Sequence, residues 1–425
     1  MKNLVIFHME SVSNIIYKLN EECFPNLRKW SQYFESYSNY YSTATSTLMV
    51  MADLFFGDIS VFDESGYLED IYTVECNKKS LFEYLNEYGY FTKVLFLGYS
   101  GHERNRKLNT VINKNGTFWD GDNVADFLFA MDECNKEEPA FAVFIEDNAS
   151  HITYCGKRVR QGICGVERYM EKYKVIDKTI GTVFEWLENN ELLNNTVVLL
   201  YGDHGDEYWF HGYHEGYTHA IEPYTSLVHC PLFIFNGENI LGIDKQVVST
   251  TDIYSLVINA LGMDKKIVGN GYAISRNLFA RQVRRADVFN KGYSITDGEY
   301  TLLLTQKGLS LFENKLDPYN MNNILDFFDL CGDSLKYNPK FDKMISSHYK
   351  NFMTDLEKEE IKKRFEKLRK ELRRYIEGNK CLEGRWNLNK LYRGSRVLDF
   401  MYCRKIRCWK MIVGRKMNKM KFKKR

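Results

Sequence analysis

The stretch TVVLLYGDHGDE, residues 196–207, joins an apolar run to a group of ionisable residues. Its aliphatic and β-branched half predicts a strand that is covered on both faces, as in a parallel sheet. Asp203 and His204 follow at once, and such groups are costly to bury unless they are paired or bind a metal. Ligands of open α/β sheets sit beyond the carboxyl ends of the strands. The stretch therefore predicts a strand that delivers two candidate metal ligands to a site.

Two other strand-like runs end in residues of the same kind. LVIFH runs into Glu10, and AFAVFI runs into Glu146, Asp147 and His151. If the three strands are parallel neighbours, these groups converge at one edge of the sheet. A mixed set of oxygen and nitrogen ligands suits Zn²⁺ or Mn²⁺ better than Ca²⁺. A concentration of histidines over residues 204–229 strengthens this interpretation: His204, His211, His214, His219 and His229.

A candidate nucleophile lies in SNYYSTATSTLMVMADLFFGD, where Ser and Thr residues precede an apolar helical segment that ends at Gly57. Ser and Thr are common helix N-caps, so a plain capped helix is one interpretation. In the other, a hydroxyl lies in the positive field of a helix N-terminus, which favours an anionic substrate. A metal on that oxygen would lower its pKa and make it a nucleophile. The residues alone leave both interpretations open.

The composition fits a globular enzyme of one main domain with a smaller one appended. Of the 425 residues, 44% are hydrophobic and 15% are aromatic, which excludes a disordered chain. Ten cysteines without a CxxC pair predict reduced thiols, as in the cytosol. The beginning of the sequence does not resemble a signal peptide, and no stretch approaches the roughly 18 to 20 apolar residues of a membrane span. We therefore expect a cytoplasmic protein, peripheral to the inner membrane face if it meets a membrane at all.

The charge is distributed unevenly along the chain. Residues 380–425 hold 16 Lys and Arg against Glu383 and Asp399, a net charge of +14, which leaves −12 for the rest of a chain whose total is +2. Trp409, Ile412 and other apolar residues interleave with these charges, which predicts contact with anionic lipid headgroups at about 1 kcal/mol per basic side chain. Charge alone would attract nucleic acid equally, and a solvated terminus is the other alternative.

Strand and helix patterns alternate along the first part of the chain, which predicts a doubly wound, mainly parallel α/β sheet flanked by helices. Short strands then predict a small antiparallel C-terminal subdomain, and a charged helix leads into the basic tail. The predicted domains are 1–285, 286–345 and 346–425. Further strands are expected at 4–8, 91–97, 140–145 and 231–235, and helices at 79–88, 122–134, 166–190 and 252–261.

Five blocks of the sequence, in order, resemble the alkaline phosphatase superfamily and its sulfatase-like branch, across about residues 1–330. They are VIFHMES, then CFPNLRKWSQYFESYSNYYS, the long segment from YMEKYKVIDKTIG to LLYGDHGDEYWFHG, HAIEPYTSLVHCPLFIF, and DGEYTLLLTQKGLSLFENKLDPYNMNNI. The resemblance implies the fold described above and one tight divalent metal site, Zn²⁺ or Mn²⁺, with room for a second, weaker one.

The resemblance also implies roles for individual residues. Glu10 matches the opening acidic metal ligand, and Asp203 and His204 match the ligand pair that follows a later strand. Ser11 stands where sulfatases have a second Asp, which favours a single tight metal. The histidines implied to contact substrate, the transferred group or a second metal are His151, His211 and His219.

The nucleophile differs from that of sulfatases. Thr47 falls where sulfatases have the cysteine that becomes formylglycine, and the C-x-P-S-R motif is absent. Ser or Thr at this position is similar to lipoteichoic acid synthases and phosphoethanolamine transferases. The latter carry a T-A-T segment, matched by Thr43-Ala44-Thr45, whose second Thr is the nucleophile. Thr47, also a metal ligand, and Thr45 both remain candidates.

The resemblance thus implies phosphoryl or phosphodiester transfer of the phosphoethanolamine or phosphoglycerol type through a phosphothreonine. A phospholipid or lipid-linked glycan is the expected substrate, and nucleic acid is not an expected partner. One alternative is a sulfatase-like hydrolase of sulfate or phosphate esters. The other is an inactive, sulfatase-like binding module.

Overall fold

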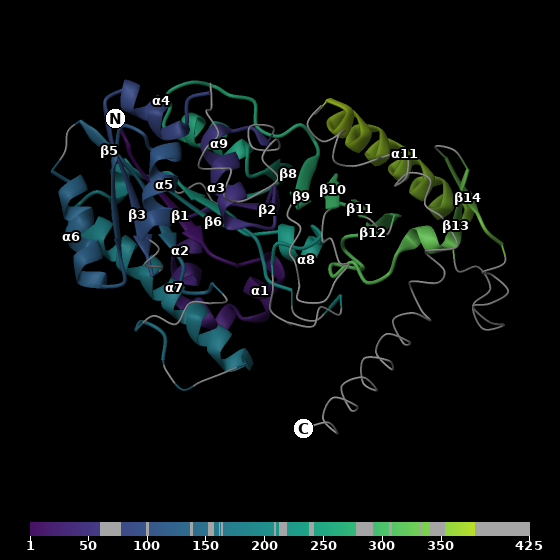
Figure 1. Cartoon of the computed structure of the whole chain (residues 1–425), viewed down its shortest axis with the longest axis horizontal. Coiled ribbons are helices and arrows are strands. Elements are labelled where there is room, and N and C mark those ends of the chain that lie inside the picture. The colour runs from purple at the N-terminus through teal and green to yellow at the C-terminus, as the bar shows by residue number, and fades with distance from the viewer. Residues whose placement is uncertain are drawn as a thin grey trace, which may run out of the picture.

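The computed structural model of the 425-residue chain describes residues 1–59, 78–98, 102–136, 139–151, 157–160, 162, 165–207, 210–211, 219–237, 242–277, 292–305, 308–331, 334–339 and 353–378 (Figure 1). A large sheet with helices on both faces occupies one part of the molecule. A smaller antiparallel sheet, covered by one long helix, lies beside it.

The large sheet has eight strands in the order β4-β3-β5-β1-β6-β7-β2-β8. All neighbours are parallel except β7, which runs antiparallel to both β6 and β2. This confirms the predicted mainly parallel α/β fold. The strands are β1 (Asn3–Met9), β2 (Glu35–Tyr41), β3 (Tyr90–Leu97), β4 (Thr117–Gly121), β5 (Ala140–Asp147), β6 (Thr196–Gly202), β7 (Leu232–Phe235) and β8 (Gly242–Ser249).

Each face of this sheet buries its own hydrophobic core. One core packs against α3 (Thr47–Phe56), α4 (Leu81–Glu87), α5 (His102–Ile112) and α9 (Asp252–Ala260). The other packs against α1 (Asn14–Leu19), α2 (Pro25–Ser31), α6 (Val124–Cys134) and α7 (Gly165–Asn189). Because both faces are covered, the central strands carry apolar residues at nearly every position, as their sequences predicted.

Strand β1 lies at the centre of this arrangement, between β5 and β6. Its register pairs Met9 with Gly202 on one side and with Asp147 on the other, so the three strands end at one level. Successive side chains alternate between faces. Leu4 and Ile6 belong to the core on the α3 side, whereas Val5 and Phe7 belong to the opposite one. The side chains of His8 and Glu10, at the next even-numbered positions, therefore point to the same face, toward α3.

The smaller sheet has the order β12-β11-β10-β9 and is antiparallel throughout. Its first strand lies upstream of the predicted boundary at residue 285. A separate hairpin follows it, and α11 packs on both through a shared apolar core. These elements are β9 (Ala273–Asn277), β10 (Gly292–Thr296), β11 (Tyr300–Thr305), β12 (Gly308–Glu313), the hairpin β13 (Phe328–Cys331) and β14 (Ser334–Tyr337), and α11 (Asp355–Gly378).

The strands and helices expected from periodicity are present, with ends that differ by at most a few residues. The basic segment 380–425 and His214 lie outside the described residues, so contact of that segment with anionic lipid stays a prediction. None of the described helices combines the length and apolarity needed to cross a membrane.

Candidate active site

Three segments that are distant in the sequence meet at the carboxyl ends of β1 and β6. Glu10 follows β1, Asp203 and His204 follow β6, and Thr47 is the first residue of α3. Glu10, Asp203 and His204 have no exposed surface, and Thr47 is 7% exposed. The structure thus brings together the four residues expected to act as metal ligands.

The hydroxyl of Thr47 lies between two of these groups. Its Oγ1 donates to Glu10 Oε2 over 3.1 Å and lies 3.2 Å from His204 Nε2. Ser46 occupies the N-cap position of α3 without a side-chain cap bond. The simple interpretation of this segment as a capped helix therefore does not account for the geometry, since the hydroxyl at the helix N-terminus faces the buried acidic and imidazole groups.

Thr45, the other candidate nucleophile, has a different partner. Its Oγ1 donates to the backbone carbonyl of Ile221 over 2.8 Å, and its own carbonyl accepts from the N–H of Ala220. These bonds tie the loop before α3 to the segment before α8 (Thr225–Val228). The structure gives Thr45 a structural contact and places Thr47 among the candidate ligands.

Helix α3 is also held from its far half by a buried ion pair. Asp53 of α3 and Arg276 of β9 make two contacts of 2.6 and 3.0 Å with almost no exposed surface. Asp53 also accepts from the hydroxyl of Thr43 over 2.5 Å, and the Arg276 guanidinium donates to the carbonyls of Thr43 and Ile59. The small sheet thereby fixes both the loop that precedes Thr47 and the helix that carries it.

Backbone and side-chain hydrogen bonds fix the two carboxylates. Asp203 Oδ1 accepts from the N–H groups of Ser11 and His204 over 2.8 and 2.7 Å. The Ser11 hydroxyl donates to Glu10 Oε1 over 2.8 Å. Ser11 has a φ of 55°, unusual for a residue other than glycine, and this conformation lets one residue donate to both carboxylates. One oxygen of each carboxylate is thus held, and the other faces the site.

His204 is oriented by a backbone carbonyl. Its Nδ1 lies 3.1 Å from the carbonyl oxygen of Gly205, which can only accept, so Nδ1 carries the proton. Nε2 then presents a lone pair to Thr47 and to Asp203 Oδ2, which is 3.1 Å away. This is the tautomer that a metal ligand requires.

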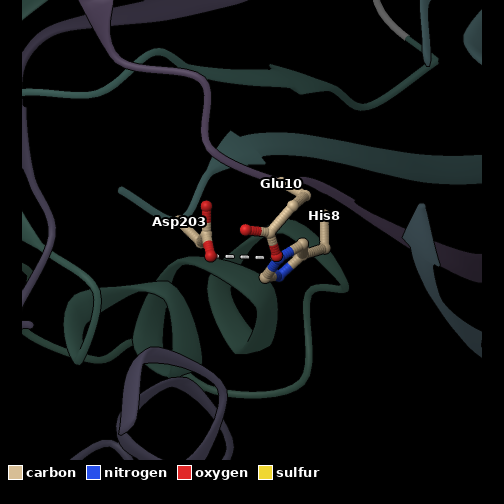
Figure 2. Close-up of side chains that lie close together, drawn as sticks. All are labelled: His8, Glu10 and Asp203. Atoms are coloured by element: carbon tan, nitrogen blue, oxygen red, sulfur yellow. Dashed lines mark ion pairs between the residues drawn. The ribbon is translucent and has the colours of Figure 1, made fainter. Parts of the chain in front are cut away.

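The structure adds His8, which the sequence interpretation treated only as the end of an apolar run. Its Nε2 lies 3.3 Å from Asp203 Oδ2 and 3.6 Å from Glu10 Oε2. Figure 2 shows the polar ends of these three side chains pointing toward one another. The signal that could have identified His8 is its spacing of two from Glu10 on a strand, which places both side chains on one face.

The charges of these groups are mutually dependent. Burial alone would raise the pKa of Glu10, but His8, His151 and His204 hold it well below its usual value. Burial would lower the pKa of His8, yet Asp203 and Glu10 outweigh it and raise the pKa to about 10. Burial lowers the pKa of His151. Glu10 therefore stays ionised and needs positive charge beside it.

Two of the predicted substrate-contacting histidines, His219 and His151, form a row that begins beside His204. The His219 ring centroid is 4.6 Å from that of His204 and 5.2 Å from that of His151. Its Nδ1 lies 2.8 Å from Asp206 Oδ1, so the carboxylate orients the ring. The Lys172 ammonium donates to the backbone carbonyl of His151 over 2.6 Å. This arrangement can present imidazole nitrogens to a group transferred at Thr47.

His211 has other partners. Its Nδ1 lies 2.8 Å from Glu207 Oε2, its Nε2 lies 3.4 Å from the carbonyl of Asn320, and its ring stacks on Tyr224 at 3.5 Å. Its contact with substrate stays a prediction.

The acidic residues at the end of β5 are paired with arginines. Glu146 binds Arg104 through two contacts of 2.9 and 3.3 Å, and Asp147 binds Arg158 through two of 2.8 and 2.9 Å. The expected convergence thus holds for the residues after β1 and β6 and for His151 after β5, whereas Glu146 and Asp147 are neutralised by arginines.

The residues at this edge fit a divalent metal. Four donor atoms face one another here, with only the Thr47 hydroxyl proton among them: Thr47 Oγ1, Glu10 Oε2, Asp203 Oδ2 and His204 Nε2. Asp203 Oδ2 has no hydrogen-bond partner among the described residues. Donors bound to one ion at about 2.1 Å stand about 3.0 to 3.4 Å apart in octahedral or tetrahedral geometry. The contacts between these donors measure 3.1 to 3.2 Å.

Comparisons with solved structures agree with this fold. The lipoteichoic acid synthase LtaP from Listeria monocytogenes superimposes with a TM-score of 0.54 at 15% identity, over 78% of this chain and 87% of that one. The PsFucS1 sulfatase from Pseudoalteromonas sp. gives 0.55 at 11% identity, over 77% and 87%. BT4656, crystallised with its substrate D-glucosamine-2-N,6-O-disulfate, gives 0.57 at 12%, over 76% and 94%. Identities this low show the fold alone.

Among curated proteins, none matches the chain by sequence. The family model named Sulfatase, in contrast, matches residues 2–263, which include every candidate site residue named above except Arg276 and Asn320. With the eight-stranded sheet and the cluster at the ends of β1 and β6, this match shows that the chain belongs to the sulfatase family.

Proposed function

We propose that this protein is a divalent-metal-dependent phosphoryl or phosphodiester transferase that works through a covalent phosphothreonine at Thr47. The observation that carries the proposal is the position of the Thr47 hydroxyl, 3.1 Å from Glu10 Oε2 and 3.2 Å from His204 Nε2 at the start of α3. A threonine is a nucleophile for phosphorus, and this chain lacks the cysteine from which sulfatases of the family make formylglycine.

Glu10, Asp203, His204 and the Thr47 oxygen would hold the ion, Zn²⁺ or Mn²⁺ by the chemistry of the donors. When bound, it lowers the pKa of the Thr47 hydroxyl, so that the proton is lost to solvent, and offsets negative charge on the phosphoryl oxygens. Thr47 Oγ1 then forms the bond to phosphorus as the bond to the donor alcohol breaks. Helix α3 is ten residues long, and the positive potential at its N-terminus stabilises negative charge on the phosphoryl oxygens.

His219 supplies the proton that the leaving alcohol needs. Its Nδ1 contact with Asp206 orients the ring, so that Nε2 is left to face the leaving alcohol. In the second step the acceptor hydroxyl gives a proton back to His219 and attacks phosphorus, and Thr47 leaves. Both steps thus use the same acid and base, and His151 beside His219 contacts the transferred group.

The proposed substrate class comes from the proteins that share this fold. The lipoteichoic acid synthase LtaP and BT4656, which binds D-glucosamine-2-N,6-O-disulfate as its substrate, share this fold, so the proposed acceptor is a glycan or a lipid-linked glycan. The proposed donor is a phospholipid headgroup such as phosphoethanolamine or phosphoglycerol. Transfer to water instead of a hydroxyl would make the same site a hydrolase.

The protein should cleave bis-p-nitrophenyl phosphate when loaded with Zn²⁺ or Mn²⁺, and should leave p-nitrophenyl sulfate intact. The reason is that a threonine oxygen can attack phosphorus but cannot form the hydrated aldehyde that sulfatases use. Release of nitrophenolate is followed for the metal-loaded protein and after chelation. Cleavage of the sulfate ester would contradict the proposal, as would phosphodiester cleavage that chelation leaves unchanged.

His219→Gln should have an effect that depends on the leaving group. With bis-p-nitrophenyl phosphate, whose leaving group needs no proton, the rate should stay within a few-fold of wild type. With an alkyl phosphodiester the loss should be about 10² to 10³-fold, the contribution of a general acid. Asp206→Asn should show the same pattern with a smaller loss. Equal losses with both substrates would instead assign His219 to binding.

A further inference from the structure

His8 is a buried imidazole beside the proposed metal centre, and it is not among the expected ligands. Its Nε2, like Oδ2 of Asp203, is buried and has no hydrogen-bond partner among the described residues. Burying a polar atom without a partner costs folding free energy, which indicates that Nε2 has a partner when the site is filled. The rest of the His8 ring packs edge-on against Phe144 and Tyr201, which leaves Nε2 directed at the two carboxylates (Figure 2).

The position of Nε2 fits a shared ion. It lies 3.3 Å from Asp203 Oδ2 and 3.6 Å from Glu10 Oε2, close to the separation of about 3.0 to 3.4 Å expected between donors on one ion. Asp203 Oδ2 in turn lies 3.1 Å from His204 Nε2. The same carboxylate oxygen therefore stands beside one imidazole from β1 and another from the loop after β6.

The other ring nitrogen is held by a phenol. His8 Nδ1 lies 2.7 Å from the hydroxyl of Tyr201 on the adjacent strand, in register with it. The Tyr201 side chain is fully buried beside the ring, so its hydroxyl is held in place. When Nδ1–H donates to the phenol oxygen, Nε2 presents its lone pair to the carboxylates. Metal-binding histidines commonly have such a partner on the second nitrogen.

We propose that His8 is a further nitrogen ligand of the divalent metal held by Glu10, Asp203 and His204. This inference rests on one part of the proposed function, namely that a divalent metal binds at Glu10, Asp203 and His204. A second imidazole makes the donor set richer in nitrogen and so favours Zn²⁺ over the oxygen-preferring Mg²⁺ and Ca²⁺. The competing arrangement is a His8 imidazolium that stays outside the metal shell as a counter-ion to the carboxylates.

The test is zinc X-ray absorption spectroscopy, in which outer-shell scattering counts imidazole ligands. The full chain should show two imidazoles on zinc, and His8→Gln should show one. Chelator competition should give a zinc dissociation constant raised at least about 10²-fold in His8→Gln. Tyr201→Phe, which keeps the ligand but removes its support, should still show two imidazoles, with affinity weakened by about 10 to 100-fold.

His229→Gln is the matched control, because His229 is a partly buried histidine that bonds the carbonyl of Ser38 and stacks on Tyr41, away from the two carboxylates. It should leave the imidazole count and the zinc affinity unchanged. One imidazole in the wild type, with unchanged zinc affinity in His8→Gln, would overturn the role of His8 while leaving the metal centre in place. No bound zinc in the wild type would overturn the metal centre itself, and this inference with it. Circular dichroism of each variant confirms that the loss is not one of folding, and Tyr201→Phe tests the inference if His8→Gln fails to fold.

Discussion

Thr47→Ala should lower turnover of a phosphodiester substrate by at least about 10⁴-fold, the scale of loss when a catalytic nucleophile is removed. The alanine methyl group cannot attack phosphorus, and the contacts of Oγ1 with Glu10 and His204 disappear with the oxygen. Thr47→Ser keeps that oxygen and should keep most of the activity. Initial rates for the metal-loaded variants, with zinc content measured in each, separate loss of the nucleophile from loss of the metal.

Thr45→Ala is the matched control for this experiment. Thr45 lies two residues away and is equally buried, but its hydroxyl bonds the carbonyl of Ile221. Its removal should cost about 1 kcal/mol of stability and leave the rate within about tenfold of wild type. Acid-quenched wild type should carry the transferred group on Thr47 itself, which tandem mass spectrometry distinguishes from Thr45 within the same peptide. A large loss in Thr45→Ala with an active Thr47→Ala would reverse the assignment.

Arg276→Met should reduce the free energy of unfolding by about 3 to 5 kcal/mol, because it leaves the Asp53 carboxylate buried without its counter-charge. The pair has almost no exposed surface, and Arg276 also donates to two backbone carbonyls. The loop before Thr47 depends on these bonds. Activity should therefore also be reduced at temperatures at which the variant is still folded. Thermal and urea unfolding of the metal-free protein measure the effect.

Two further variants control for this effect. The double variant Asp53→Leu, Arg276→Met removes both charges and should recover most of the stability, since the cost comes from the unpaired carboxylate. Arg364→Met removes an arginine that pairs with Asp297 at a more exposed site and should cost no more than about 1 kcal/mol. A stable Arg276→Met protein would show that Asp53 is neutral or solvated there.

The sequence predicted most of the large sheet because its central strands are continuous apolar runs. Strand β2 was missed: ESYSNYY mixes serines with tyrosines and has neither a strict alternation nor an apolar run. Its pairing with β7 and β8 depends on strands that are far away in the sequence. Local pattern therefore identifies a strand only when burial on both faces has made the strand apolar.

The candidate site was predictable in part for a related reason. Asp203 and His204 stand out in the sequence because they end an apolar run. Glu10 stands out for the same reason, at the end of β1. The choice between Thr45 and Thr47 needed the path of the loop before α3, which the partners Ile221 and Arg276 determine. His8 was hidden within a strand, since its chemistry depends on a carboxylate that follows a different strand.

The central position of β1 also has a consequence for the synthesis of this protein on the ribosome. Strand β1 needs two partners that are both made after it, β5 at residues 140–147 and β6 at residues 196–202. At roughly 5 to 20 residues per second, β1 waits about 10 to 40 s for its second neighbour. During that time an apolar strand and the carboxylate of Glu10 stay without their native partners, so the nascent chain needs protection from aggregation until β6 has emerged.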